Sequence, residues 1–296
     1  MILKYTVVTT DDFYSVKNVL RNHFHVSTRL LNKLNKLGMI FLNEAKCNIN
    51  SPIQAGDIVS FSLNYDEDNS NIIPTKMDLD IVFEDNSLIV INKPPFMAIH
   101  PTSYHFDDTL SNGVRYYYDK IGLKKKIRPV NRLDRNTSGL VVFAKNEFIQ
   151  ELLIKQMKKG MFKKKYLGIV EGVLENKEDS INAPISRKEN SIIERKIDDK
   201  GFPSMTHYKV LQEFSNYSLV EFCLETGRTH QIRVHTQFIG HPLLGDSLYG
   251  KESVLINRQA LHSYYICFNH PLSGVLLKLK SKLPKDMQKL VSSSID

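Results

Sequence analysis

One carboxylate stands out in the stretch RPVNRLDRNTSGLVVFAKN, residues 128–146, because Asp134 lies between Arg132 and Arg135. Nearby positive charge favours the ionised form of a carboxylate, and an ionised aspartate suits a nucleophile or a base better than an acid. A structural Asp–Arg pair at the entrance to a strand is the alternative, and the short motif alone favours it. The motif therefore marks Asp134 as a candidate catalytic residue without identifying the reaction.

Several common classes of active site lack their signatures in this sequence. No HExxH, Walker lysine loop, GxGxxG or G-x-S-x-G pattern occurs. The acids nearest to Asp134 along the chain form no motif that would suggest a glycosidase pair. His230 and His235 are five residues apart, so they diverge on a helix. We therefore expect neither a metal site nor a cofactor.

A second segment, LETGRTHQIRVHTQFIGHPLLGDSLYG at residues 224–250, combines hydrogen-bonding side chains with a glycine-rich path. Arg228 falls in the turn after an expected strand, and Arg233 falls on the helix that follows. The apolar face of this helix would hold Val234, Phe238 and Ile239. A helix-and-turn scaffold with exposed polar residues is the alternative interpretation.

The elements that must position these residues are mainly strands. Residues 87–95, 139–146, 166–174, 206–214 and 217–225 are β-branched, aromatic or alternating. Residues 148–160 and 229–240 have helical patterns that end at glycine. Strands in hairpin-like succession with few helices predict an α+β fold rather than a doubly wound parallel one.

The N-terminal part differs in composition from the rest. Residues 64–78 are acidic, rich in Asn and contain a proline, so they resemble a linker. We predict a small domain over residues 1–70, a linker over 71–78 and a large domain over 79–296. In the small domain, Ser27 and Gly38 predict the ends of a helix with leucines on one side. Its opposite side carries Arg29, Lys33 and Lys36, and a solvated charged face is the bland interpretation.

The bulk composition favours an anionic partner and a reducing compartment. The 296 residues carry a net charge of +8, and the isoelectric point is about 9.2. The three cysteines are widely spaced and form no CxxC pair, so we expect no disulfide framework. No signal peptide and no membrane span are expected. We expect a monomer in the cytoplasm.

The small domain resembles a known RNA-binding module. The pattern SxRLxxKLxxxGxIxxN begins at Ser27, and GDxV follows at residues 56–59. This arrangement resembles the S4-like RNA-binding module, a small α+β domain first named for a ribosomal protein. The resemblance implies that Arg29, Lys33 and Lys36 contact RNA.

The large domain resembles the RluA-type family of RNA pseudouridine synthases. The resemblance rests on NRLDRNTSG, on LETGRTHQIRVHTQFIGHPLLGDSLYG, and on INKPP, AIHP and KKKYLGIVEG in the same order, over about residues 79–250. It implies a mixed, mainly antiparallel sheet and the isomerisation of uridines in structured RNA without metal or cofactor. Ribosomal RNA is the favoured substrate, and transfer RNA also fits. A non-catalytic RNA-binding or ribosome-assembly factor on the same fold is the alternative.

The resemblance also implies a role for individual residues. Asp134 matches the catalytic aspartate, and Arg233 matches the basic residue that pairs with it. Tyr166 matches the tyrosine that stacks on the target base, and Arg132 the arginine that helps to move the target nucleotide out of its stack. The sequence does not decide whether the aspartate attacks the sugar, attacks the base or removes a proton from the sugar.

Other positions of the motifs have weaker implications. Leu244, or its neighbour Leu243, would form an apolar wall of the pocket, while Arg228 and His230 would support the loop or touch RNA. Asn131 departs from the family, which usually has His before RLD. Asn keeps a donor and an acceptor but cannot take a charge, so substrate preference would differ if this position touched RNA.

Overall fold

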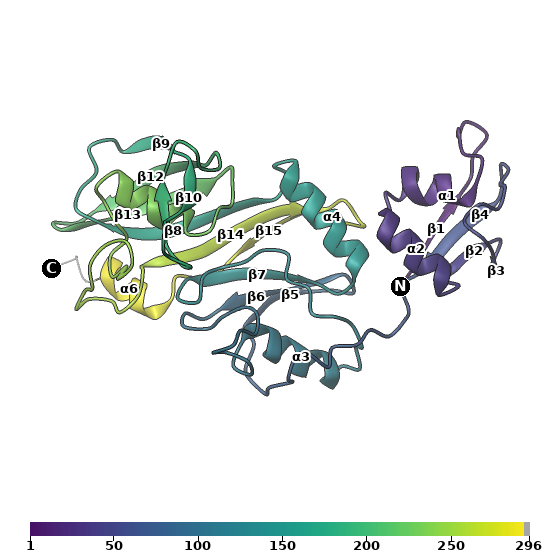
Figure 1. The fold of residues 1–296 in the computed structure, drawn as a ribbon, viewed down its shortest axis with the longest axis horizontal. Coiled ribbons are helices and arrows are strands. Elements are labelled where there is room, and N and C mark those ends of the chain that lie inside the picture. The colour runs from purple at the N-terminus through teal and green to yellow at the C-terminus, as the bar shows by residue number, and fades with distance from the viewer. Residues whose placement is uncertain (293–296) are drawn as a thin grey trace.

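The computed structural model describes residues 1–292 of the chain. Figure 1 shows a small N-terminal region beside helix α4 (Glu147–Lys158) and a long sheet that extends away from it. The two regions share hydrophobic packing, because Phe61 of the N-terminal region meets Phe148 of α4 with ring centroids 5.4 Å apart. The predicted domain limits stay a prediction.

The N-terminal region is a four-stranded antiparallel sheet with short helices. Its elements are β1 (Ile2–Thr6), α1 (Val16–Asn18), the π-helical turn η1 (Val19–His23), α2 (Thr28–Lys36), β2 (Ile40–Leu42), β3 (Ala45–Lys46) and β4 (Ile58–Ser62), with strand order β1-β4-β2-β3. The hydroxyl of Ser27 accepts the N–H of Leu30 and so caps α2. Gly38 has a φ of 63°, as a helix-ending glycine requires. The predicted helix is therefore confirmed.

The large region is built on one nine-stranded sheet. Its strands are β5 (Ile81–Glu84), β6 (Leu88–Lys93), β7 (Ser138–Ala144), β14 (Leu261–Asn269), β8 (Lys163–Glu171), β13 (Tyr217–Leu224), β12 (Met205–Glu213) and β9 (Glu178–Asn182) in spatial order, with β15 (Leu276–Lys280) beside β14. Neighbours are antiparallel except β7 and β14, which are parallel. The predicted α+β class with a mainly antiparallel sheet is confirmed.

Four helices and a small hairpin complete this region. They are α3 (Leu110–Lys120), α4, α5 (Gln231–Phe238), α6 (Lys285–Ser292) and the hairpin of β10 (Ile185–Arg187) and β11 (Arg195–Ile197). The five predicted strands and the two predicted helices of the large region are confirmed, with ends shifted by a few residues. The sequence analysis did not predict α3, α6 or β14.

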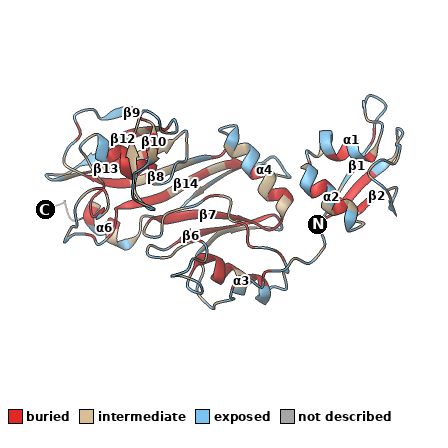
Figure 2. Cartoon of the chain, in the orientation of Figure 1, coloured by how far each residue is buried: buried red, intermediate tan, exposed pale blue. Residues whose placement is uncertain are grey.

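The core lies on the central strands. All seven residues of β7 are buried, and Figure 2 shows the same for most of its neighbour β6. Both faces of a central strand are covered here, so β7 is a continuous apolar run rather than an alternating one. The turn that carries Asp134 directly precedes this buried strand. Within residues 1–292, no helix has the length and apolar character that crossing a membrane requires.

Candidate active site

The turn that carries Asp134 ends at a glycine that no other residue could replace. Gly139 has a φ of 117°, and a Cβ atom there would lie 2.3 Å from the backbone oxygen of Ser263. This close approach is what lets the start of β7 pair with β14. Just before it, the N–H of Thr137 donates to the carbonyl of Asp134 at 3.1 Å and closes the turn. The Thr-Ser-Gly sequence therefore fixes the position of the Asp134 turn relative to the start of β7.

Two buried cations hold the backbone of this turn. Arg258 is fully buried, donates to the carbonyl of Asn136 at 3.0 Å and pairs with Asp286 of α6 at 2.7 Å. Lys93 is also fully buried and donates to the carbonyl of Arg135 at 3.0 Å. Burial lowers the pKa of Lys93 to about 7. The backbone of the turn is thus anchored by two buried side chains, one from β6 and one from the segment before β14.

Asn131 belongs to this scaffold. Its amide donates to the carbonyl of Leu140 at 3.0 Å, and its oxygen accepts the N–H of Val142 at 2.8 Å. The side chain is 3% exposed, so it does not face a bound RNA. Asn131 satisfies backbone groups at β7, a task that needs one donor and one acceptor but no charge, and the structure gives it no direct contact with RNA through which substrate preference would change.

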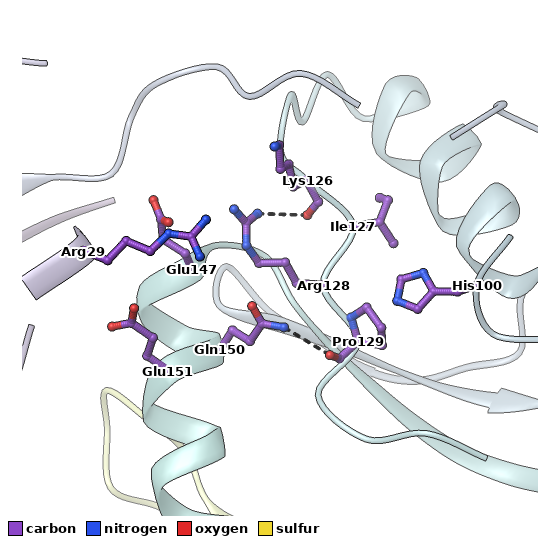
Figure 3. Close-up of a pocket in the computed structure, with 9 residues that line it drawn as sticks. All are labelled: Arg29, His100, Lys126, Ile127, Arg128, Pro129, Glu147, Gln150 and Glu151. Atoms are coloured by element: carbon purple, nitrogen blue, oxygen red, sulfur yellow. Dashed lines mark hydrogen bonds between the residues drawn. The ribbon is translucent and has the colours of Figure 1, made fainter. Parts of the chain in front are cut away.

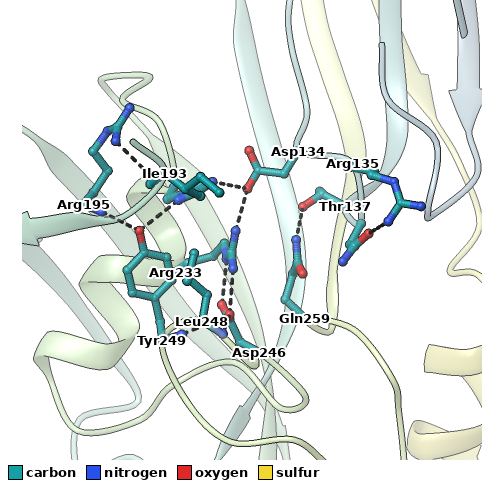
Figure 4. Close-up of polar contacts among 12 residues, drawn as sticks. Asp134, Arg135, Thr137, Ile193, Arg195, Arg233, Asp246, Leu248, Tyr249 and Gln259 are labelled. Carbon is teal, nitrogen blue, oxygen red and sulfur yellow. Dashed lines mark hydrogen bonds and ion pairs between the residues drawn. The ribbon is translucent and has the colours of Figure 1, made fainter. Parts of the chain in front are cut away.

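The charged partner of Asp134 comes from helix α5. Nη1 of Arg233 lies 3.3 Å from Oδ2 of Asp134 (Figure 4). The other side of the guanidinium binds Asp246 through two hydrogen bonds of 2.7 Å each. Asp246 also accepts the backbone N–H groups of Leu248 and Tyr249. Asp246 therefore fixes Arg233, and Arg233 offers its remaining edge to Asp134.

The arginines next to Asp134 in the sequence do not hold it. Arg135 donates to Asn136, and the side chain of Arg132 is exposed and makes no hydrogen bond or ion pair within residues 1–292. The alternative of a structural pair between Asp134 and a neighbouring arginine is therefore corrected for these two residues. Successive side chains of an extended segment point in different directions, so the two arginines do not contact the carboxylate of Asp134 although they are close to it in sequence.

Asp134 has one engaged oxygen and one open oxygen. Arg233 and Nε2 of His230, at 3.7 Å, both approach Oδ2. Across the described chain, Oδ1 receives no hydrogen bond, and the side chain is 29% exposed. The carboxylate is thus held from one side and accessible from the other, the arrangement that a reacting group needs.

Tyr166 lies beside this carboxylate on β8. Its ring is buried and packs in one cluster with Leu243 and Phe222. Burial first, and then the charge of Asp134, raise the pKa of Tyr166 above its ordinary value, so the phenol stays protonated. Leu244 lies instead with Ile169 in the cluster that packs on α6. Leu243 and Leu244 thus pack in different clusters, and both are buried, so the expected apolar wall of the pocket stays a prediction.

Arg228 lies at the exposed rim. Its guanidinium is 5.3 Å from the ring centroid of Phe202, and Nε donates weakly to the carbonyl of Pro203 at 3.4 Å. Neither contact brings it to Asp134. The backbone N–H of Arg228 donates to Gln231, which stabilises the turn before α5.

The three basic residues predicted to bind RNA on helix α2 differ in their contacts. Lys33 is paired with Glu67 at 2.9 Å and with Glu147 at 2.6 Å, so its charge is used within the protein. Arg29 and Lys36 are exposed, and neither makes an ion pair in the described part of the chain. Figure 3 shows Arg29 at one end of a groove of about 390 Å³, with His100 at the other end.

Asp246 and Tyr249 are the site residues that the sequence analysis missed. Both stand in the segment that contains GHPLLGD, which was singled out, but no spacing links them to Arg233 or His230. Residues 1–292 contain no group of three or more His, Cys, Asp or Glu side chains that could hold a metal ion.

Comparison with known proteins identifies the family. The model of the RNA pseudouridylate synthase family matches residues 87–238, a span that contains Asp134, Tyr166 and Arg233. The RNA pseudouridine synthase YhcT of Bacillus subtilis, described as uncharacterized, is 43% identical over 81% of this chain and 80% of its own length. Ribosomal large subunit pseudouridine synthase D of Haemophilus ducreyi is 33% identical over 88% of this chain and 83% of its own.

A solved structure agrees with this assignment. Human RNA pseudouridylate synthase domain containing 1 superposes with a TM-score of 0.57 at 25% identity, over 73% of this chain and 94% of that protein. The family match over residues 87–238 includes the Asp134 turn and strands β6, β7, β8, β9, β12 and β13 of the large sheet. The chain belongs to the RNA pseudouridylate synthase family and is an enzyme that isomerises uridine in RNA to pseudouridine.

Proposed function

We propose that this enzyme modifies specific uridines in folded ribosomal RNA and that Asp134 is its catalytic carboxylate. The observation that carries the proposal is the asymmetry of Asp134: Arg233 approaches one oxygen at 3.3 Å, and the other has no partner in the described chain. An aligned and accessible carboxylate can attack the sugar, attack the base or remove a proton. The support for ribosomal RNA is the name of the 33% identical relative from Haemophilus ducreyi.

The reaction conserves all atoms of the nucleotide. The bond between C1′ of the ribose and N1 of uracil breaks, the base rotates, and C5 forms a new bond to C1′. The hydrogen of C5 leaves as a proton, and N1 gains one. Asp134 would supply the carboxylate during bond exchange, and no electron donor or acceptor is needed. The buried phenol of Tyr166 stays protonated and does not compete as a base.

The target uridine must leave its stack to reach this pocket. Extrusion costs a few kcal/mol, and stacking on an aromatic ring can return about 1–3 kcal/mol. Tyr166 lies beside Asp134 in the same apolar cluster as Leu243, and we assign its ring to the contact with the base. Arg132 is exposed, lies two residues before Asp134 in the sequence, and is our candidate for the group that takes the place of the extruded nucleotide or holds its phosphate.

RNA outside the pocket would meet the exposed cations of both regions. We assign Arg29, Lys36 and Arg228 to this role because their guanidinium or ammonium groups are exposed and free of ion pairs within residues 1–292. Lys33 is assigned to the contact between the regions instead. Phosphate contacts of this kind add affinity and make binding salt-dependent. A monomer in the cytoplasm remains our proposal for the working state.

A map of pseudouridine in ribosomal and transfer RNA tests the proposal. Cells that lack this protein should lose one or a few ribosomal sites, and the wild-type protein should restore them. Lost sites in transfer RNA only would contradict the substrate assignment. Restoration of every site by Asp134→Asn would contradict the catalytic assignment and favour a non-catalytic RNA-binding factor.

A further inference from the structure

A short polar chain runs from the β10–β11 hairpin to Asp134. The backbone N–H of Arg195 donates to the hydroxyl oxygen of Tyr249 at 2.7 Å. The same hydroxyl lies 2.9 Å from Nδ1 of His230, whose Nε2 is 3.7 Å from Oδ2 of Asp134. Figure 4 shows Arg195, Tyr249 and Asp134 around this chain. Arg195 and Asp134 come from distant parts of the sequence, so this series of polar contacts connects the β10–β11 hairpin with the Asp134 turn.

The contacts of Tyr249 decide which nitrogen of His230 carries the proton. A backbone N–H only donates, so Tyr249 accepts from Arg195 and keeps its own proton to donate. The Tyr249 side chain is buried, and in residues 1–292 the acceptor that its hydroxyl can reach is Nδ1 of His230. Nδ1 is therefore the acceptor, and the neutral ring carries its proton on Nε2. That N–H is the one that faces Asp134.

The backbone of His230 is also unusual. Its φ is 60°, in the left-handed region that residues other than glycine seldom adopt. Such a conformation is strained and persists where the surroundings enforce it. Here it stands at the first position before α5, between the rim of the pocket and the helix that carries Arg233.

We propose that His230 is a positioning residue for Asp134, acting with Arg233 on the same oxygen. The inference rests on the proposed role of Asp134. Nη1 of Arg233 lies 3.3 Å from Oδ2 of Asp134, and Nε2 of His230 lies 3.7 Å from it. The longer distance exceeds a hydrogen bond and would shorten when RNA closes the pocket, as catalytic contacts often do. Two donors on Oδ2 would direct Oδ1 to the substrate.

The charge of the His230 ring affects how it acts on Asp134. Burial lowers the pKa of His230, while the Asp134 carboxylate works in the opposite direction. The charged or titratable groups that face the ring are Asp134, Tyr249, Arg195, Arg233 and Asp246. A neutral ring orients the carboxylate without adding a second full positive charge beside it. A protonated ring would further neutralise the charge of the carboxylate and weaken it as a nucleophile or as a base.

The first test measures the tautomer directly. A long-range proton–nitrogen NMR spectrum of the ¹⁵N-histidine-labelled enzyme should show His230 with Nε2 protonated and Nδ1 as an acceptor, assigned by the peak missing in His230→Gln. In Tyr249→Phe the Nδ1 signal should shift, because its donor is gone. A proton on Nδ1 in the wild-type enzyme would overturn the proposal, whatever Asp134 does.

The second test separates positioning from folding. His230→Ala should lower the single-turnover rate by up to about 100-fold, the cost of a misplaced reacting group, with RNA affinity unchanged. His230→Gln can place an amide N–H near the Nε2 position and should recover part of the rate. His230→Asn is the matched control, because its shorter amide reaches only the Nδ1 position. Equal rates in the Ala and Gln variants would overturn the proposal, as would full activity of His230→Ala.

Activity of Asp134→Asn in the same assay reports on a different claim. A wild-type rate in that variant would contradict the catalytic role of Asp134, and His230 would then have no reacting group to position. An inactive Asp134→Asn together with a Gln variant faster than the Ala variant supports both claims. An inactive Asp134→Asn together with equal Ala and Gln rates rejects the His230 proposal alone.

Discussion

Two networks of carboxylates and cations in this enzyme use the same residue types for different ends. In the first, Glu67 receives two hydrogen bonds of 2.7 and 2.8 Å from Arg128 and one of 2.9 Å from Lys33. In the second, Asp134 receives a single hydrogen bond, of 3.3 Å, from Arg233. The Glu67 side chain is 4% exposed and the Asp134 side chain 29% exposed.

The difference lies in how completely the carboxylate is satisfied. Both oxygens of Glu67 are used, so this group joins α2, the segment after β4 and the chain before the Asp134 turn without any capacity left to react. Asp134 retains an open oxygen, because the strong bidentate bond of Arg233 goes to Asp246. A carboxylate whose two oxygens are both used in ion pairs is therefore weak support for catalysis, and a carboxylate with one open oxygen is stronger support.

Breaking the second network should have the largest effect on activity. Arg233→Met removes the partner of Asp134 and should lower the single-turnover rate by about 10²–10³-fold, the range seen when one electrostatic donor is lost. It also leaves Asp246 buried without its cation, so the melting temperature should fall as well. Rapid quench with pseudouridine detection measures the rate, below the melting temperature of the variant. An Arg233→Met rate near that of the wild type would contradict this account of the site.

Breaking the first network should change stability and spare chemistry. Arg128→Met leaves the buried Glu67 with one cation fewer and should lower the free energy of unfolding by about 3–5 kcal/mol. Its matched control is Lys124→Met, because Lys124 and Asp66 form an exposed pair nearby at 3.4 Å and should contribute under about 1 kcal/mol. Urea unfolding measures both. Similar values for the two variants would show that the Glu67 network is not the stronger contact.

The pH dependence of stability sharpens the same contrast. Burial alone would raise the pKa of Glu67, but hydrogen bonds from Arg128 and Lys33 lower it to about 2, from an ordinary 4.5. The folded state thus binds this proton less tightly than the unfolded state, and the stability that Glu67 contributes is complete above pH 4.5 and lost as the pH falls towards 2. The gap in unfolding free energy between wild type and Glu67→Gln should therefore shrink over that range. A constant gap would contradict the pairing.

The smallest effect concerns the divided face of α2. Arg29→Gln and Lys36→Gln should each reduce the salt dependence of RNA binding by about one phosphate contact and leave the melting temperature unchanged. Lys33→Gln should instead lower the melting temperature, because its ammonium joins Glu67 and Glu147. Binding titrations at several salt concentrations measure the slopes. An unchanged melting temperature in Lys33→Gln would contradict the structural role of Lys33 and favour its first assignment to RNA binding.

The sequence predicted what depends on local patterns. Five strands of the large sheet, β6, β7, β8, β12 and β13, and helices α2, α4 and α5 followed from alternation, periodicity and caps, and the RLD motif marked Asp134. Lys33 and Lys36 share a helix face, and only tertiary packing makes one of them an interior cation. Asp246 lies thirteen residues beyond Arg233 in a turn, so no helical or strand period connects them. Such contacts depend on how distant segments meet, which a single sequence does not state.

The central claim is that Asp134 performs the chemistry while the rest of the enzyme binds and positions the RNA. The direct measurement is single-turnover formation of pseudouridine by purified wild type and Asp134→Asn on the ribosomal RNA that the cellular map identifies, with RNA affinity measured in parallel. Asn has the same shape and lacks the charge, so binding should be retained. The account predicts equal affinity and no detectable product from Asp134→Asn. Product at the wild-type rate would contradict it.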